Sequence, residues 1–377
     1  MAETASLDAG PAGPSPLPAP LRAVHTPNFP ALLRRLNASL LVTTYQAGKL
    51  VMVREEGDRL NCHFRTFAAP MGLALRGDRL AIGTSLQVWE YRDVPAVAAK
   101  VDGPVRPDAV FLPRSCHVTG NIQVHEMAWG AGRDELWAVN TRFSCLCTLD
   151  GSASFTPRWR PPFVSQLEPT DRCHLNGLAM EDGRPRYATA LGATDSPAGW
   201  RADKARGGVL MDVPSGEFVA TGLSMPHSPR LHGGKLWVCE SGAGTLGIID
   251  PATGKYEAVA SAPGFTRGLD FAGGLAFVGL SQVRESAVFS GIPITERLEA
   301  SERTCGVCAV DLASGNVVAL LRFESAVQEV FAVQVLPGRR YPDLINDDTK
   351  LLENSFSLPE EALGDVPDAL RPGSGPG

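Results

Sequence analysis

The middle of the chain alternates between short apolar runs and short turns that are rich in glycine, aspartate or proline. Six segments share one form, in which a small polar start leads into an apolar run, a turn and a second apolar run. Each of these segments predicts a β-hairpin. They are APMGLALRGDRLAIGT (69–84), QVHEMAWGAGRDELWAVNT (123–141), HLNGLAMEDGRPRYATAL (174–191), PHSPRLHGGKLWVCES (226–241), FTRGLDFAGGLAFVGL (265–280) and EVFAVQVLPGRRYPDLI (329–345).

The spacing of these segments predicts a repeat architecture. Equivalent positions recur with a mean step of about 52 residues, which fits one four-stranded blade per repeat. Strand pairs such as TLGIIDPATGKYEAVA lie between the hairpins and supply the outer strands. The fold class is therefore all-β, a six-bladed β-propeller over residues 25–350. The strand pair ASLLVTTYQAGKLVMVRE (38–55) is suited to close the ring in the last blade.

Other segments depart from the strand pattern. NFPALLRRLN (28–37) predicts one short helix, and PDAVFLPRS (107–115) predicts an inserted loop. The Pro/Ala-rich lead at 1–24 and the tail at 351–377 are expected to be disordered. A lid or rim is expected in the long connections, around 92–120, 151–172, 192–206 and 283–304.

The repeat register predicts which side chains line the central channel. The innermost strand of each propeller blade borders the channel, and side chains two positions apart share a face. One expected ring consists of Met71, His125, Asn176, His227, Arg267 and Phe331. A second ring, one step outward along the channel, consists of Ala69, Gln123, His174, Met225, Phe265 and Glu329. His232 lies at an odd offset from His227 and is expected to face away.

Three imidazoles from successive blades suggest a metal site. His125, His174 and His227 are candidate ligands for a divalent transition metal such as Zn, Fe or Cu, with Asn176 as a weaker ligand. Two other interpretations stay open, namely a polar substrate pocket without metal and histidines that only hydrogen-bond to water and to one another.

Charged side chains near the rings are candidate catalytic groups. Glu126 and Glu329 could act as a base or orient a ring nitrogen, and Arg267 could bind a substrate anion. An arginine in such a channel can also do no more than balance a carboxylate.

Composition narrows the function classes. A formal net charge of −6 and the absence of a long Lys/Arg block argue against a nucleic-acid binder. No run of eighteen or more apolar residues predicts a membrane span, and the first residues do not form a secretory signal. A cytoplasmic location is the resulting expectation.

The cysteines and the missing motifs exclude several chemistries. The pairs Cys145/Cys147 and Cys305/Cys308 are expected to be buried, reduced thiols, since a second pair for a zinc ribbon is missing. The chain lacks the Gly-x-Ser-x-Gly elbow, the phosphate-binding loop and the zincin helix. No dinucleotide fingerprint follows a strand, so no nucleotide cofactor is expected.

Some phrases resemble known propellers. HLNGLAM and PHSPRLHGGKLWVCESGAGTLGIID resemble inner strands of the gluconolactonase, regucalcin and strictosidine-synthase-like propellers. The chain from LLVTTYQAGKLVMV to VFAVQVLPGRRYPDLIND looks closer still to a bacterial family of uncharacterised propeller proteins without a settled activity. That resemblance covers roughly residues 25–350.

The resemblance to the lactonase superfamily implies a divalent cation at the channel. Its ligands there are an early Glu, the Asn of an Asn-Gly-Leu phrase and an Asp of the next blade. Asn176 matches the Asn, His227 stands in place of the Asp, and His125 stands where a substrate-contacting Asn is usual. No residue matches the early Glu. Nitrogen in place of oxygen ligands favours a softer metal than calcium.

The leading hypothesis is a propeller enzyme, metal-dependent at the channel mouth, that acts on a small molecule or a peptide. Its reaction would be lactonase- or hydrolase-like, or oxidative. The alternative is a non-catalytic module that binds a ligand or a protein partner, because a propeller fold does not fix function.

Overall fold

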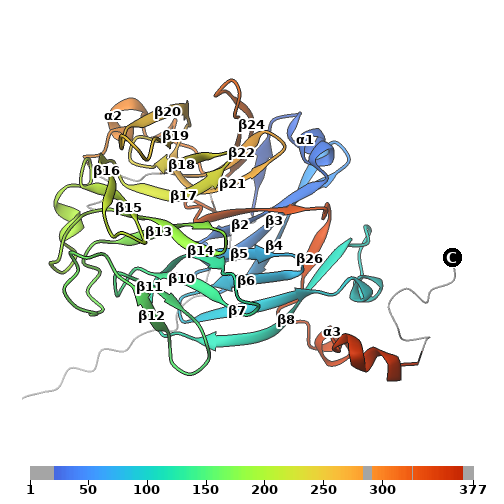
Figure 1. Cartoon of the computed structure of the whole chain (residues 1–377). Coiled ribbons are helices and arrows are strands. Elements are labelled where there is room, and N and C mark those ends of the chain that lie inside the picture. The colour runs from blue at the N-terminus through green and yellow to red at the C-terminus, as the bar shows by residue number, and fades with distance from the viewer. Residues whose placement is uncertain (1–20, 283–290, 325, 368–377) are drawn as a thin grey trace, which may run out of the picture.

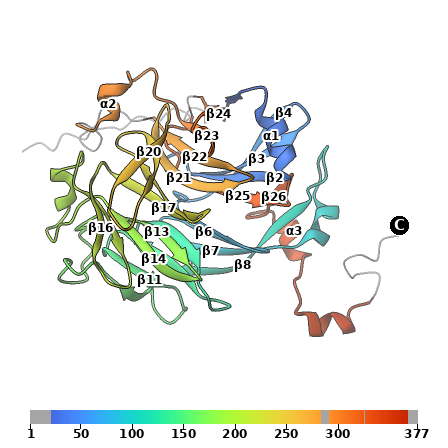
Figure 2. The ribbon, with the colours of Figure 1, turned by 45° about the horizontal axis from the view of Figure 1, so that its top comes forward.

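A computed structural model describes residues 21–282, 291–324 and 326–367. Strands make up 46% of the described residues and helices 10%, and these strands form six mainly antiparallel sheets around a central axis (Figures 1 and 2). We number these sheets as blades 1 to 6. The predicted six-bladed β-propeller is therefore confirmed.

Blades 1 to 3 follow one another along the chain, each beginning with its innermost strand. Blade 1 contains β5 (Leu73–Arg76), β6 (Arg79–Gly83), β7 (Gln87–Asp93) and β8 (Ala109–Val118). Blade 2 contains β9 (Val124–Trp129), β10 (Leu136–Asn140), β11 (Cys145–Thr148) and β12 (Thr156–Trp159). Blade 3 contains β13 (Leu175–Glu181), β14 (Arg184–Ala190), β15 (Gly208–Asp212) and β16 (Phe218–Leu223).

Blades 4 and 5 repeat this order, and blade 6 joins the two ends of the chain. Blade 4 contains β17 (Pro226–His232), β18 (Lys235–Glu240), β19 (Thr245–Ile249) and β20 (Tyr256–Ser261). Blade 5 contains β21 (Phe265–Ala272), β22 (Leu275–Ser281), β23 (Gly306–Asp311) and β24 (Val317–Phe323), and β1 (Ala23–His25) extends it. Blade 6 contains β25 (Ala332–Pro337), β2 (Ala38–Thr44), β3 (Lys49–Glu56) and β4 (Arg59–Thr66).

The closure of the ring confirms one prediction and corrects another. The 38–55 segment supplies β2 and β3 of blade 6, as expected. The segment 329–345 is not a hairpin, because β2 occupies the place of the returning strand beside β25. Its second half forms β26 (Pro342–Leu344), which pairs in parallel with β8 of blade 1.

The predicted loop at 107–115 is also wrong, because most of it belongs to β8. Pro113 lies in this strand at a register shift opposite Tyr91, a position where the ladder tolerates a missing N–H. The helix predicted at 28–37 is confirmed as α1 (Phe29–Leu36).

Short helices occupy several connections and the C-terminal region. They are η1 (Pro95–Lys100), η2 (Gly199–Ala202), α2 (Ile294–Arg297), α3 (Thr349–Glu353) and η3 (Glu360–Asp365). Helix α3 lies outside the ring of blades (Figure 1). Residues 1–20 of the predicted lead and 368–377 of the predicted tail lie outside the described residues, whereas β1 begins at Ala23 within the lead.

The apolar core consists of clusters between neighbouring blades. Phe29, Val53 and Phe277 represent the cluster between blades 5 and 6, where α1 covers its edge. Equivalent clusters join each of the other neighbouring blades. This packing buries both faces of each sheet and holds the six innermost strands around one channel.

Hydroxyl groups connect the inner edges of the blades. Thr141, which follows β10, donates to the carbonyl oxygen of Leu175 in the next blade, and Ser241 donates to that of Thr266. Thr43 of blade 6 donates in the same way to Met71 before blade 1. These bonds fix the positions from which the channel side chains project.

Candidate functional site

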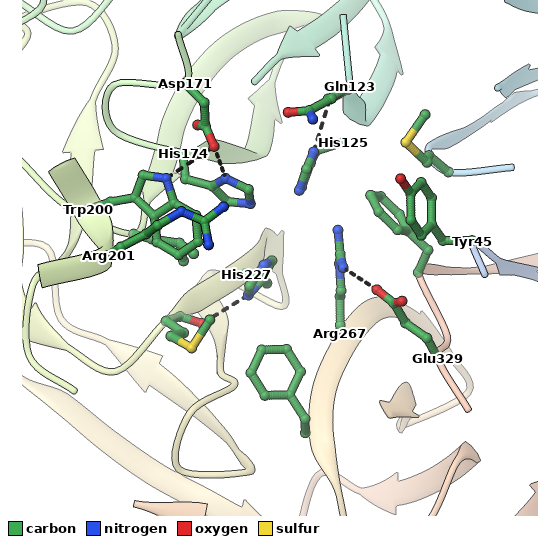
Figure 3. A pocket seen from close by; sticks show the side chains of 15 residues that line it. Tyr45, Gln123, His125, Asp171, His174, Trp200, Arg201, His227, Arg267 and Glu329 are labelled. Atoms are coloured by element: carbon green, nitrogen blue, oxygen red, sulfur yellow. Dashed lines mark hydrogen bonds and ion pairs between the residues drawn. The ribbon is translucent and has the colours of Figure 1, made fainter. Parts of the chain in front are cut away.

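A cavity of about 200 Å³ lies in the channel, where the innermost strands begin. The cavity is smaller than the pockets of about 300–1,000 Å³ that are typical for drug-sized ligands, so its size suits a smaller molecule. Figure 3 shows imidazole, guanidinium and aromatic side chains converging on it. Its lining consists of Tyr45, Met71, Gln123, His125, Asp171, His174, Leu191, Trp200, Arg201, Met225, His227, Phe265, Arg267, Glu329 and Phe331.

The lining includes most of the two rings that the register predicts. All members of the first ring except Asn176 line the cavity, and all members of the second except Ala69. The periodic register therefore places these side chains correctly, although it does not test what they bind.

The backbone is strained at the start of the inner strands. Ala69, Gln123, His174 and Met225 have φ angles of 49°, 51°, 51° and 47°. A non-glycine residue in this left-handed region costs about 1–2 kcal/mol. The repeated conformation turns Gln123, His174 and Met225 toward the cavity that they line, and such strain is common at functional sites.

His125 and His227 are held in the same way in blades 2 and 4. Nδ1 of His125 lies 3.0 Å from the carbonyl oxygen of Gln123 and 2.8 Å from Oγ1 of Thr141. Nδ1 of His227 lies 2.9 Å from both the carbonyl oxygen of Met225 and Oγ of Ser241. A carbonyl oxygen only accepts, so Nδ1 carries the proton in both rings.

The electrostatic environment keeps both rings neutral. Burial lowers the pKa of His125 and of His227 well below the usual value, and the nearby Arg267 lowers both further. Both side chains are buried. A neutral ring with its proton on Nδ1 has a lone pair on Nε2.

His174 differs in its partner, which is a carboxylate. Its Nδ1 lies 2.8 Å from Oδ2 of Asp171, and Nε1 of Trp200 donates to the same oxygen at 3.0 Å. The Trp200 ring also contacts the imidazole, with 4.4 Å between centroids. In Figure 3, Asp171 lies on the side of His174 that faces away from the middle of the cavity.

Arg267 and Arg201 are the arginines that line the cavity, and the pairing of Arg267 is incomplete. Nη1 donates to Glu329 at 3.2 Å, and the guanidinium carbon lies 3.4 Å from the Phe331 ring centroid. Nη2 is buried and has no hydrogen-bond partner among the described residues. Burial lowers the pKa of Arg267 to about 10, with Glu329 opposing the shift, so the side chain is cationic near neutral pH.

Asn176 and Glu126 lie apart from the cavity. Oδ1 of Asn176 accepts a hydrogen bond from Thr189 at 2.7 Å. Glu126 accepts from Nη2 of Arg230 at 2.7 Å and from the backbone N–H of Leu178 at 2.7 Å. The proposed roles of Asn176 as a ligand and of Glu126 as a base therefore have no support from their positions.

The donor atoms around the cavity do not form an evident metal site. Within the described ranges, no group of three or more His, Cys, Asp or Glu side chains is arranged to hold a metal ion. The Arg267 cation, which lowers the pKa of His125 and His227, also opposes a second cation between them. The transition metal stays a prediction, and these residues give it no fit.

Several lining residues come from connections that the repeat register does not cover. Trp200 and Arg201 lie in the 192–206 connection, which was expected to form a lid or rim, and Asp171 lies in the 151–172 connection. Tyr45 follows β2, outside any inner strand. The sequence signal for Asp171, Trp200 and Arg201 is only the length and position of their connections, and Tyr45 lies in the turn of the predicted strand pair 38–55.

The predicted cysteine pairs are free thiols. All eight cysteines are free, and Cys145, Cys147, Cys305 and Cys308 are buried. Burial raises the pKa of Cys145, Cys305 and Cys308 to about 12, which makes these thiols unreactive near neutral pH.

The fold and the cavity together define a six-bladed β-propeller with a polar, histidine-lined site in its channel. The chain belongs to the family described as "Domain of unknown function (DUF4915)", whose model matches residues 27–345. No curated protein matches the chain in sequence.

Two solved structures are similar in fold. One is a crystal structure of a nidogen/laminin complex, with 11% identity and a TM-score of 0.52, over 80% of this chain and 99% of that chain. The other is a protein of unknown function from Bacteroides caccae, with 10% identity and a TM-score of 0.50, over 79% and 98%. At these identities the likeness shows the propeller fold alone. No helix of the described residues is long and apolar enough to cross a membrane.

Proposed function

We propose that the cavity is the active site of a hydrolase for a small ester or cyclic ester. One observation carries the proposal: Nη2 of Arg267 is buried without a partner in a cavity that it shares with the Asp171–His174 pair. An unpaired buried donor costs about 1–3 kcal/mol. That cost would be offset when a negative oxygen of a substrate or product accepts from Nη2.

His174 is the proposed general base. Its Nδ1–H donates to Asp171, so Nε2 can take a proton from water while the water oxygen bonds to the carbonyl carbon. Arg267 stabilises the oxyanion that forms there. The carbon–oxygen bond to the leaving alcohol then breaks, and the imidazolium returns the proton to the alkoxide. Asp171 orients the ring throughout.

The size of the cavity supports a small molecule rather than a peptide. Trp200, Phe265 and Phe331 give it apolar walls, and about 200 Å³ would hold a molecule of only several non-hydrogen atoms. The oxidative reaction that the sequence left open has no comparable support from the arrangement of these side chains.

The metal-dependent alternative has one supporting observation. Nδ1 of His125, His174 and His227 is occupied in each ring, an arrangement that is common for metal-bound histidine. Elemental analysis of the purified protein tests it. Stoichiometric zinc, iron or copper that is lost in a folded His125→Ala/His174→Ala/His227→Ala variant would favour this alternative.

The second alternative is a binding module without catalysis. It is favoured by the fold neighbour in a nidogen/laminin complex, but only at the level of the fold. A module of this kind would bind through the propeller surface, and its binding would not depend on His174.

The experiment is proton release from a panel of short lactones and aryl esters, followed at constant pH with the full-length protein. His174→Gln is expected to lower kcat about 10²–10⁴-fold, the usual contribution of a general base. Arg267→Met is expected to lower it about 10²–10³-fold, as for loss of an oxyanion donor.

His232→Gln is the matched control. His232 stacks on Phe271 with 4.2 Å between ring centroids and does not line the cavity, so its replacement should leave the rate unchanged. Hydrolysis that His174→Gln leaves intact would contradict the proposed base. A panel without any turnover, combined with partner binding that survives His174→Gln, would favour the non-catalytic module.

A further inference from the structure

The hydrogen-bonding capacity of the cavity is unusual because acceptors dominate one side of it. The protons of Thr141 and Ser241 are used on the carbonyl oxygens of Leu175 and Thr266. Each hydroxyl can therefore only accept from the neighbouring imidazole, which confirms the proton position on Nδ1 of His125 and His227.

The other nitrogen of each ring is available to a ligand. No described residue is hydrogen-bonded to Nε2 of His125 or His227, and both rings border the cavity (Figure 3). These two nitrogens accept hydrogen bonds. Arg267, which also lines the cavity, provides a donor, because its Nη2 is buried without a described partner.

We propose that the ligand of this cavity is a small hydroxylated carboxylate. Its carboxylate accepts from Nη2 of Arg267, and two of its hydroxyl groups donate to Nε2 of His125 and His227. This inference rests on the proposed function, because a hydroxy acid is the product that hydrolysis of its cyclic ester leaves in the cavity.

The charge of Arg267 selects hydroxyl groups over ammonium groups as donors. Both could donate to a neutral imidazole. An ammonium group would bring a second cation close to Arg267, whose charge is already felt at both histidines. Of the two carboxylates of the lining, Glu329 is paired with Arg267, and Asp171 is paired with His174 through Oδ2 while its Oδ1 has no described partner. Amino acids are therefore expected to bind less tightly than hydroxy acids.

Blade 3 provides a natural design for the test variants. Asn176 occupies the position equivalent to His125 and His227, two residues after a left-handed residue. Its Oδ1 bonds to Thr189, and the side chain does not reach the cavity. His125→Asn and His227→Asn should therefore be accepted by the fold while they remove the acceptors.

The experiment is calorimetric titration of the full-length protein with matched pairs of acids that differ only in hydroxyl groups. The pairs are tartrate with succinate and glycerate with propionate. Tartrate and glycerate are expected to bind about 10-fold more tightly than their partners, since each neutral hydrogen bond contributes about 3- to 10-fold. Serine, compared with glycerate, tests the preference against ammonium.

The variants assign the preference to the histidines. His125→Asn and His227→Asn should each reduce the hydroxyl preference about 3- to 10-fold, with little change for succinate or propionate. Arg267→Met should lower the affinity for all four acids about 10- to 100-fold. His232→Asn replaces a ring outside the cavity and should leave the affinities for all four acids unchanged.

Two results would overturn different parts of the argument. If succinate and propionate bind as tightly as their hydroxylated partners and still depend on Arg267, hydroxyl recognition is wrong and the anion site of the proposed function stands. If no acid binds in the millimolar range, or binding is the same in Arg267→Met, the anion site of the proposed function fails as well.

Discussion

Two layers of the channel use polar residues in opposite ways. The outer layer is the cavity, where Nη2 of Arg267 and Oε1 of Gln123 are buried without described partners. One step along the strands, Glu126 of β9 pairs with Arg230 of β17 at 2.7 Å. We name this pair, together with Asp270 of β21, the inner polar layer.

The inner polar layer satisfies its carboxylates with bonds to neighbouring blades. Glu126 accepts from the backbone N–H of Leu178 in blade 3 as well as from Arg230 in blade 4. Asp270 accepts from the backbone N–H of Phe271 in its own strand and from that of Val335 in blade 6. Charges that are paired across blades fix the relative positions of the inner strands.

The contrast separates stability from function along a single strand. His125 and Glu126 are adjacent in β9, yet one borders the cavity and the other joins three blades. Natural proteins rarely leave buried polar atoms without partners, so Nη2 of Arg267 and Oε1 of Gln123 are the atoms that a ligand or water in the cavity would satisfy. Replacements in the two layers should therefore have opposite consequences.

The largest expected effect on stability is in the inner polar layer. Glu126→Leu leaves the Arg230 cation and the Leu178 N–H without their carboxylate. We expect the free energy of unfolding to fall by about 2–4 kcal/mol, as when one partner of a buried ion pair is removed. Urea denaturation monitored by tryptophan fluorescence measures it. Glu126→Gln, which keeps an acceptor, should cost less, and a loss below about 1 kcal/mol in Glu126→Leu would remove the distinction between the layers.

The second prediction concerns the pH dependence of stability at the cavity. Burial lowers the pKa of His125 and His227 in the folded state, while the unfolded chain has the ordinary value of about 6.5. Below that value the unfolded state binds more protons, so the stability that these rings provide is present above about pH 7 and is lost as the pH falls. Each ring should account for about 1 kcal/mol between pH 7.5 and 5.5.

His125→Asn/His227→Asn is the matched variant for this measurement. The charged and titratable neighbours Arg267 and His174 stay in place in it. Its unfolding free energy should fall less steeply toward pH 5.5 than that of the wild type, and the two proteins should have parallel profiles above pH 7.5. Identical slopes throughout would show that the two rings titrate normally in the folded state.

The sequence was sufficient for the ring of blades because its signal is periodic. Alternation along each inner strand placed His125, His227 and Arg267 at the channel, and the structure has them there. The same periodicity misassigned the segment at 329–345, since pairing between distant parts of the chain is not visible in a local pattern. The structure shows that β25 pairs with β2, from the start of the chain, and not with the segment that follows β25 in the sequence.

The rest of the site depends on side-chain length and on the conformation of the connections rather than on the periodic repeat. Asn176 has the predicted backbone position, but its short amide is bound to Thr189 and does not reach the cavity. Asp171 and Trp200 come from connections whose conformation no repeat dictates. The carboxylate that orients His174 could therefore be found only in three dimensions.

Arg267→Met should change stability less than Glu126→Leu does, because its effects on the folded state oppose each other. Removal of a buried, incompletely paired cation is favourable, whereas loss of its bond to Glu329 and of its contact with Phe331 is unfavourable. Because these effects oppose each other, the free energy of unfolding should change by less than about 1 kcal/mol. Urea denaturation under the same conditions gives the comparison, and a loss as large as that of Glu126→Leu would show that Arg267 is mainly structural.

The smallest expected effect tests whether a cavity residue can change function without changing stability. Trp200→Phe keeps an aromatic ring against His174 but removes the Nε1–H that donates to Oδ2 of Asp171. Asp171 then has more freedom, and His174 is held less firmly. We expect the rate of proton release to fall about 3- to 10-fold, which is part of the roughly 1.5–3 kcal/mol of a hydrogen bond to a charged group, because Asp171 keeps its bond to His174. The free energy of unfolding is expected to fall by less than about 1 kcal/mol. The pH profile of the rate distinguishes this positioning role from a structural one, because only the former moves the limb that reports the base. If the rate and its pH profile are both those of the wild type, Trp200 does not act through Asp171. In that case only Arg267 and the histidines distinguish the cavity from the inner polar layer.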